Sequence, residues 1–161
     1  MNKKPIKFIL FISVIVFAIL IMITFNIGTF YNDSVLNSFS KQLYYCKLPE
    51  GTVIIEKQNI CGKLNGNGDG MDFLACILIT SDKTIDDLEK YFDSINFKGA
   101  KSSSKTAKLQ VITITNNNLH TEYLEHREII FNEPIRINDF KYYAVIIYDG
   151  GYWNFLDFRG A

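Results

Sequence analysis

The chain has 161 residues, of which 48% are hydrophobic, and its 17 Lys and Arg balance 17 Asp and Glu. Three lysines precede an apolar N-terminal segment, so the remainder carries 14 basic against 17 acidic residues, a formal charge of −3. That charge does not attract a phosphate backbone, and we expect no nucleic-acid partner. The apolar content argues against a disordered chain, and the length suits one membrane segment and one small domain.

Residues 8 to 25, FILFISVIVFAILIMITF, are predicted to cross a membrane. They carry no charge, and with the residues behind them they exceed the roughly 20 apolar residues that span a hydrocarbon core. A cleaved signal peptide is the alternative, but the apolar run is longer than the usual h-region and no small-x-small site follows it. A lipoprotein is disfavoured because bulky tyrosines precede Cys46. We therefore expect a retained transmembrane signal anchor at residues 8–29.

Basic residues flank this segment on its N-terminal side only. Lys3, Lys4 and Lys7 precede it, and the next basic residue is Lys41. The positive-inside rule then places residues 1–7 in the cytoplasm and the rest of the chain outside. We therefore expect a single-pass protein of the cell membrane with an extracytoplasmic C-terminal domain.

A juxtamembrane helix and linker are predicted at residues 30–50. Asp33 or Ser34 is a possible N-cap for a helix over residues 33–45, and Pro49 ends it. The helix would bury one apolar stripe. Its members are Val35, Leu36, Phe39 and Leu43.

Two strands are predicted to follow. Residues 52–64 begin with β-branched residues and are bounded by turn residues. Residues 71–79, MDFLACILI, are apolar at both alternating positions, as in a central strand covered on each side. The tract NGNGDG, residues 65–70, lies between them. Because Gly and Asn tolerate positive φ, this tract predicts a hairpin loop.

Further strands are predicted near the C-terminus. Residues 109–115 are β-branched and read as a strand. Residues 119–131 fit neither the strand nor the helix period, and we favour a strand paired back on the previous one. Residues 141–158 are rich in aromatics and predict a hairpin that turns at residues 149–151.

One helix is predicted within the outer domain, residues 51–161. Thr84 is a suitable N-cap, and Asp87 stands at the capping-box position. An apolar stripe follows at helical spacing. Together these elements predict an α+β fold with a mainly antiparallel sheet and one packed helix.

Four motifs occur in the outer part: LPEGT, GKLNGNGDGM, a helix preceded by SD, and LDFRG. Together they resemble those of a family of short, uncharacterised membrane-anchored proteins of low-GC Gram-positive bacteria. The resemblance covers about residues 48–160 and implies an architecture without an activity. The hairpin motif positions are Gly62, Lys63, Leu64, Gly66, Asn67, Gly68, Gly70 and Met71.

Calcium binding is the sharpest alternative for the Gly/Asn tract. In an EF-hand-like loop, Asn65, Asn67 and Asp69 would take the first, third and fifth ligand positions, with Gly70 at the sharp turn. The twelfth position falls on Cys76, where a bidentate Glu belongs. We therefore favour a structural hairpin loop in which Asp69 ligates nothing, and we expect no metal.

His120 and His126 would share a face with Glu122 and Glu128 on a strand. Such a cluster could ligate a metal or supply an acid/base pair. We favour a solvent-facing polar row, because an H-x-E arrangement without a third specific ligand is common by chance.

Three cysteines leave at least one thiol unpaired within the chain. Cys61 and Cys76 depart from the family's pattern and lie in apolar strands, where thiols are usually inert. If Leu64 opposes Met71 the two share a sheet face, whereas a register centred one residue away places them on opposite faces. We predict a reduced or only partly formed bond.

Aromatic residues near the C-terminus could line a groove or face a partner. Strands of period 2 bury about half of them, which leaves the other half for binding. They are Tyr142, Tyr143, Tyr148, Tyr152, Trp153, Phe155 and Phe158.

The sequence thus predicts a membrane-anchored extracytoplasmic interaction or accessory domain, with a possible protein partner at the cell surface. It indicates no catalytic residue and no cofactor, and an enzyme is less favoured. The alternative is a small-ligand or ion-binding domain that uses the Gly/Asn loop or the His/Glu face.

Overall fold

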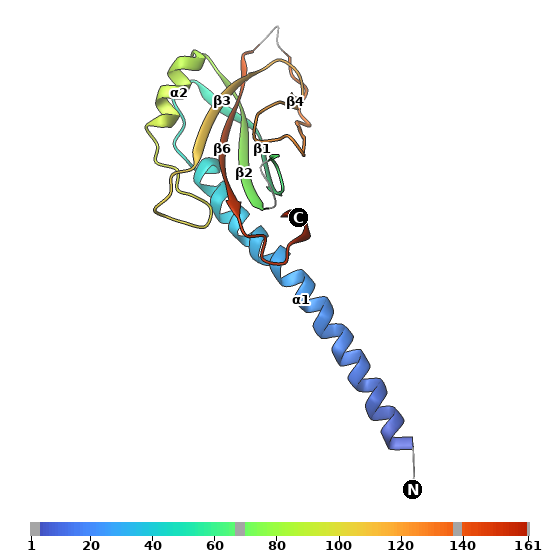
Figure 1. Ribbon diagram of the computed structural model, residues 1–161. Helices are drawn as coiled ribbons and strands as arrows, with labels where there is room; N and C mark the ends of the chain where they lie inside the picture. The colour runs from blue at the N-terminus through green and yellow to red at the C-terminus, as the bar shows by residue number, and fades with distance from the viewer. Residues whose placement is uncertain (1–3, 67–69, 137–139, 161) are drawn as a thin grey trace.

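The computed structural model describes residues 4–66, 70–136 and 140–160, which form a long N-terminal helix and a small α+β domain at its C-terminal end (Figure 1). The domain is built on a four-stranded antiparallel sheet in the order β1-β2-β6-β3, with a separate two-stranded pair, β4-β5. The elements are α1 (Lys4–Tyr44), β1 (Thr52–Gly62), β2 (Met71–Ser81), α2 (Ile85–Asp93), β3 (Lys108–Ile114), β4 (Asn118–Leu119), β5 (Ile129–Ile130), β6 (Tyr142–Tyr152) and the 3-10 helix η1 (Phe158–Gly160).

Helix α1 is long and apolar enough to cross a membrane. Its N-terminal part projects away from the domain, and its C-terminal part lies against the sheet (Figure 1). Leu36, Phe39 and Leu43 are buried in the core there. The expected cap at Asp33 or Ser34 is wrong, because α1 continues through both residues without a break. The predicted anchor and the predicted juxtamembrane helix are therefore parts of one continuous helix.

The sheet is covered on both faces. Helices α1 and α2 cover one face, where Leu88 and Phe92 of α2 join the core with Phe39 of α1. Residues 118–131, which we call the β4-β5 lobe, cover the other face with side chains that include Leu124 and Phe131. This two-sided cover confirms β2 as the central buried strand that its apolar sequence predicts.

Helix α2 starts as predicted. The Thr84 side chain accepts a hydrogen bond from the backbone N–H of Asp87 at 3.2 Å, which satisfies one of the free donors of the first turn. The Thr84 hydroxyl in turn donates to the Asp87 carboxylate at 2.7 Å.

Two predictions for the C-terminal half are wrong. Residues 119–131 do not form a strand on β3, since only the ends of this stretch pair, as β4 with β5. Residues 141–158 do not form a hairpin either, because β6 runs on through Gly150 and Gly151 as a bulge opposite Asp72. The Asp72 carboxylate accepts a hydrogen bond from the Gly151 N–H at 2.9 Å, which holds the bulge.

The register of β1 on β2 separates the two strand cysteines. Cys61 lies opposite Phe73 and Cys76 lies opposite Gln58. Cys61 therefore belongs to the core beneath the helices, and Cys76 to the core beneath the β4-β5 lobe. The sheet stands between the two thiols, and all three cysteines are free.

Candidate functional site

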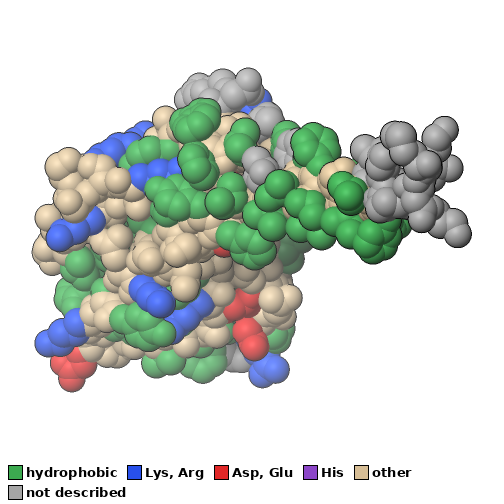
Figure 2. Space-filling model, turned by 90° about the horizontal axis from the view of Figure 1, so that it is seen from below, with side chains coloured by type: hydrophobic (Ala, Val, Ile, Leu, Met, Phe, Trp, Pro, Cys, Tyr) green, Lys and Arg blue, Asp and Glu red, His purple; other side chains and the backbone are tan. Residues whose placement is uncertain are grey.

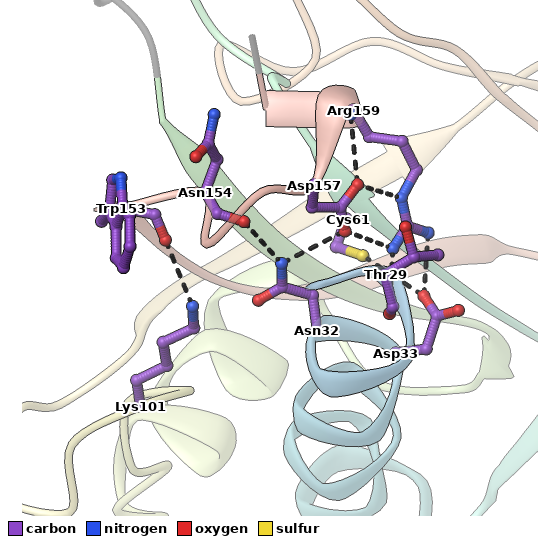
Figure 3. A network of polar contacts seen from close by, with 9 residues as sticks. All are labelled: Thr29, Asn32, Asp33, Cys61, Lys101, Trp153, Asn154, Asp157 and Arg159. Atoms are coloured by element: carbon purple, nitrogen blue, oxygen red, sulfur yellow. Dashed lines mark hydrogen bonds and ion pairs between the residues drawn. The ribbon is translucent and has the colours of Figure 1, made fainter. Parts of the chain in front are cut away.

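The C-terminal segment, residues 153–160, lies against α1 where the helix enters the domain (Figure 3). We call this region the junction. Gly28 makes the contact possible, because a Cβ at that position would overlap the backbone oxygen of Phe155. A glycine inside a helix is unfavourable by about 1 kcal/mol, so its position here has a packing reason.

Asp157 is the buried centre of the junction, with 1% of its side chain exposed. Its carboxylate accepts hydrogen bonds from Asn32 Nδ2 at 3.1 Å and from Arg159 Nε at 2.9 Å. Burial alone would raise the pKa of Asp157, but these hydrogen bonds outweigh it and hold the pKa below its ordinary value. The carboxylate is thus a charged, structural group.

Arg159 joins Asp157 to helix α1. One guanidinium nitrogen lies 2.8 Å from Asp33 Oδ1, and the other donates to Asp157 at 2.6 Å and to the backbone oxygen of Thr29 at 3.4 Å. The planar guanidinium suits this forked contact, and the hydrogen bonding that it donates to the Asp157 carboxylate is the main reason why the pKa of Arg159 rises.

The same segment also holds the loop between β1 and β2. The Lys63 N–H donates to Arg159 O at 2.6 Å, and the Gly70 N–H donates to Gly160 O at 3.0 Å. Gly62 has φ +142°, and a Cβ there would lie 2.8 Å from Arg159 O. The motifs GKLNGNGDGM and LDFRG, far apart in sequence, therefore meet at the junction.

The glycines of the Gly/Asn tract that the structure describes do not have the predicted backbone conformation. Gly66 and Gly70 are not among the positive-φ residues, so the backbone reason expected for them is wrong. The Gly66 N–H donates to Glu125 Oε2 at 2.8 Å, and a Cβ at this position would meet the movable end of the same side chain. Asn67, Gly68 and Asp69 lie outside the described residues.

Asn65, the first residue of the calcium-like pattern, is already engaged. Its Nδ2 donates to the Tyr148 hydroxyl at 2.6 Å. Asp72 fixes the start of the loop, because its carboxylate also accepts from the Leu64 N–H at 3.1 Å. Met71, the last motif residue, is fully buried in the core beneath the helices.

His120 and His126 lie in the β4-β5 lobe and not on one strand face. They border an open hollow of about 690 Å³ that also includes Glu125, Arg127 and Glu128, whereas Glu122 does not line it. Within the described parts of the chain, no group of three or more His, Cys, Asp and Glu residues could hold a metal. The structure does bring the two predicted site segments together, since His126 N–H donates to Leu64 O at 2.9 Å.

A pocket of about 440 Å³ opens beside the junction. It is lined by Tyr31, Lys101, Tyr152, Trp153 and Phe155. The Lys101 ammonium lies 5.1 Å from the ring centre of Tyr31 and 5.6 Å from that of Tyr152. Burial lowers the pKa of Lys101. We call this hollow the junction pocket.

Sequence reasoning found part of this site. The LDFRG motif contains Asp157 and Arg159, but neither of them had a predicted role, and Asn32 and Lys101 belong to none of the motifs. About half of the predicted aromatic set is buried, namely Tyr142, Tyr143 and Tyr148, while Trp153, Phe155 and Phe158 are exposed. The expected period-2 alternation is not the cause, because both sheet faces are covered along β6 and the exposed three lie beyond its end.

No family model, curated protein or solved structure matches this chain. The resemblance to membrane-anchored proteins of Gram-positive bacteria therefore stays a prediction, and the function is argued from the structure alone.

Proposed function

We propose that the protein is a single-pass membrane protein, with its N-terminus in the cytoplasm, whose extracytoplasmic α+β domain binds a protein partner at the cell surface. The apolar length of α1 supports the anchor, and the lysines that precede it support the orientation. Because α1 continues into the core, the domain is attached to the anchor without a flexible linker. Such an attachment suits a domain that presents one surface at a constant distance from the membrane.

The unpaired outer edge of β1 is the main observation that supports a protein partner. Strand β1 ends the order β1-β2-β6-β3, and none of the strands in the described ranges pairs with its outer side. Val53 is 59% exposed and Ile55 37% exposed along that strand. An extended segment of a partner can add to such an edge through backbone hydrogen bonds.

The edge is also protected against unselective pairing. A bulge interrupts the register between Ile54 and Glu56, and a lysine follows at residue 57. The Glu56 side chain accepts hydrogen bonds from the backbone and side chain of Asn132, at 2.8 and 2.9 Å, which hold the strand against the lobe. We therefore expect a specific partner strand and not general aggregation.

A photo-crosslinking residue placed at Val53 of the full-length protein tests this function in intact cells. We expect one discrete crosslinked protein adduct from Val53 and none from Glu89, an exposed control position on α2. Equal adducts from both positions, or none from Val53, would refute the β1 edge as the binding surface.

A second candidate is a small-ligand or ion site where the Gly/Asn loop meets the β4-β5 lobe. The contact between Gly66 N–H and Glu125, beside the hollow lined by His120 and His126, favours it. Melting temperatures with calcium and with zinc test it. A metal-dependent rise that Glu125→Gln removes would support this function, because ligand binding stabilises the folded state. Unchanged melting temperatures with both metals would rule out an ion site.

A further inference from the structure

The junction lies at a defined depth if α1 crosses the membrane as proposed. An α-helix rises 1.5 Å per residue and needs about 20 residues to cross the hydrocarbon core. Counted from Phe8, the first residue after the N-terminal lysines, about 20 residues end near Gly28, where Phe155 contacts α1. The C-terminal segment then lies at the level of the lipid headgroups.

Exposed aromatic side chains surround α1 at that level. Phe30 and Trp153 are each 72% exposed and Phe158 is 67% exposed. Seen from below, hydrophobic side chains continue from α1 onto the adjoining face of the domain, and Lys and Arg side chains lie beside them (Figure 2). Aromatic rings with neighbouring cations are typical of the membrane interface.

Lys101 lines the junction pocket, whereas Asn32 is fully buried next to it, outside the pocket lining. Lys101 is absent from the ion pairs of the described residues, and its one hydrogen bond goes to Trp153 O at a long 3.4 Å. Asn32 is fully buried, and its Oδ1 has no hydrogen-bond partner. Leaving such a buried acceptor unsatisfied is unfavourable.

The orientation of the Asn32 amide is defined by its surroundings. Its Nδ2 donates to Asn154 O at 3.0 Å and to the Asp157 carboxylate at 3.1 Å, and both of these groups only accept. The oxygen must therefore point the other way, and Figure 3 shows it on the side of Lys101. The ammonium of Lys101 therefore stands at the pocket wall without an ion-pair partner among the described residues, and the buried Asn32 oxygen supplies no second cation beside it.

We propose that the junction pocket binds the headgroup of an anionic phospholipid in the leaflet that α1 enters. The phosphate contacts the Lys101 ammonium, and Trp153, Phe30 and Phe158 lie in the interface around it. This assignment rests on the proposed membrane span of α1. Its consequence is that the domain rests on the bilayer surface instead of standing clear of it.

Trp153 is the only tryptophan of the chain, so its fluorescence reports on this site alone. The full-length protein is reconstituted into vesicles of phosphatidylcholine, with or without phosphatidylglycerol, and one lipid at a time carries brominated chains that quench tryptophan. We expect quenching by bromines near the headgroup, and stronger quenching by brominated phosphatidylglycerol than by brominated phosphatidylcholine at equal content.

Lys101→Gln should reduce that preference for phosphatidylglycerol about fivefold, which corresponds to ~1 kcal/mol per basic residue at a membrane surface. Lys90→Gln, at an exposed position of α2 far from the junction, is the matched control and should leave it unchanged. Inorganic phosphate should not compete. Competition by inorganic phosphate would overturn the lipid as the source of the anion.

Alkaline extraction of the same vesicles tests the proposed membrane span independently of the proposed lipid site. Protein that washes off the vesicles would overturn the membrane span itself and the lipid assignment with it. Protein that stays in the vesicles with Trp153 unquenched would overturn the lipid site alone. Equal quenching by both lipids, unaffected by Lys101→Gln, would show interfacial contact without a headgroup site and would likewise overturn the assignment.

Discussion

At the scale of single residues, Asp157 is the charged group that links the C-terminal segment to α1. It is a buried carboxylate whose hydrogen bonds reach α1 through Asn32 and the guanidinium of Arg159. Removing one partner of such a group leaves a buried donor or acceptor unpaired. The free-energy cost of that unpaired group exceeds the net stabilisation that the hydrogen bond gives. Helix α1 and the C-terminal segment are thus joined through one charged group.

Asp157→Asn is predicted to lower the free energy of unfolding by about 2 kcal/mol at neutral pH, since the ion pair with Arg159 is lost. Because the folded pKa of Asp157 lies below the unfolded value, its stabilisation is full above the unfolded pKa of about 3.9 and is lost as pH falls through the folded pKa. The difference between wild type and variant should therefore shrink below about pH 4.

Denaturant unfolding of the full-length protein in detergent, measured across pH, checks both statements. Glu89→Gln, on the exposed face of α2, should change stability by less than about 0.5 kcal/mol and serves as the control. A difference that stays constant down to pH 2 would contradict the role of the Asp157 charge.

Gly62 and Gly66 are predicted to respond differently to one added methyl group. Gly62→Ala should lower stability by about 1–3 kcal/mol, because φ is +142° and Arg159 O lies 2.8 Å from the new Cβ. Gly66→Ala should be nearly neutral, because the Glu125 side chain that it meets can move. Thermal unfolding of both variants measures this, and equal losses would show that the whole loop is constrained alike.

At the scale of elements, α1 belongs to two environments. Its first part is exposed and apolar, whereas Phe39 and Leu43 are at most 1% exposed within the domain core. Burying a large apolar side chain stabilises a domain by several kcal/mol, so these turns are part of the folding unit. The expected start of the domain at residue 51 therefore excludes side chains that its core contains.

Shortened chains are predicted to reveal this boundary. Residues 26–161 should unfold cooperatively, whereas residues 46–161 should not, because Leu36, Phe39 and Leu43 would each be missing from the core at about 2–5 kcal/mol. Their sum approaches the whole stability of a typical domain. Circular dichroism during heating distinguishes the two chains, and a cooperative transition for residues 46–161 would place the boundary after α1.

At the scale of the whole molecule, the sheet separates Cys76 from the other two thiols. Cys46 is partly exposed, and Cys61 and Cys76 lie in the cores on opposite faces. Burial raises the pKa of Cys61 to about 11 and also raises the pKa of Cys76, so little thiolate forms near neutral pH.

Mass spectrometry of the non-reduced protein is predicted to show no bond between Cys61 and Cys76. A membrane-impermeant thiol reagent should modify Cys46 first in intact cells, because the proposed orientation places it outside. The buried pair should react only after unfolding. Labelling of Cys46 that requires cell lysis would reverse the orientation, and a complete Cys61–Cys76 disulfide would contradict the register of β1 on β2.

The sequence by itself determined the apolar helix, the α+β class, the central strand β2 and the Thr84 cap, because each depends on composition or on spacing within one segment. Only the tertiary structure decided the continuity of α1, the bulge at residues 149–151 and the irregular path of residues 119–131, since these follow from contacts between distant segments. The junction belongs to the second kind. Asn32, Lys101 and Asp157 lie far apart in the sequence, and folding alone brings them together, because helix α1 and the C-terminal segment pack side by side.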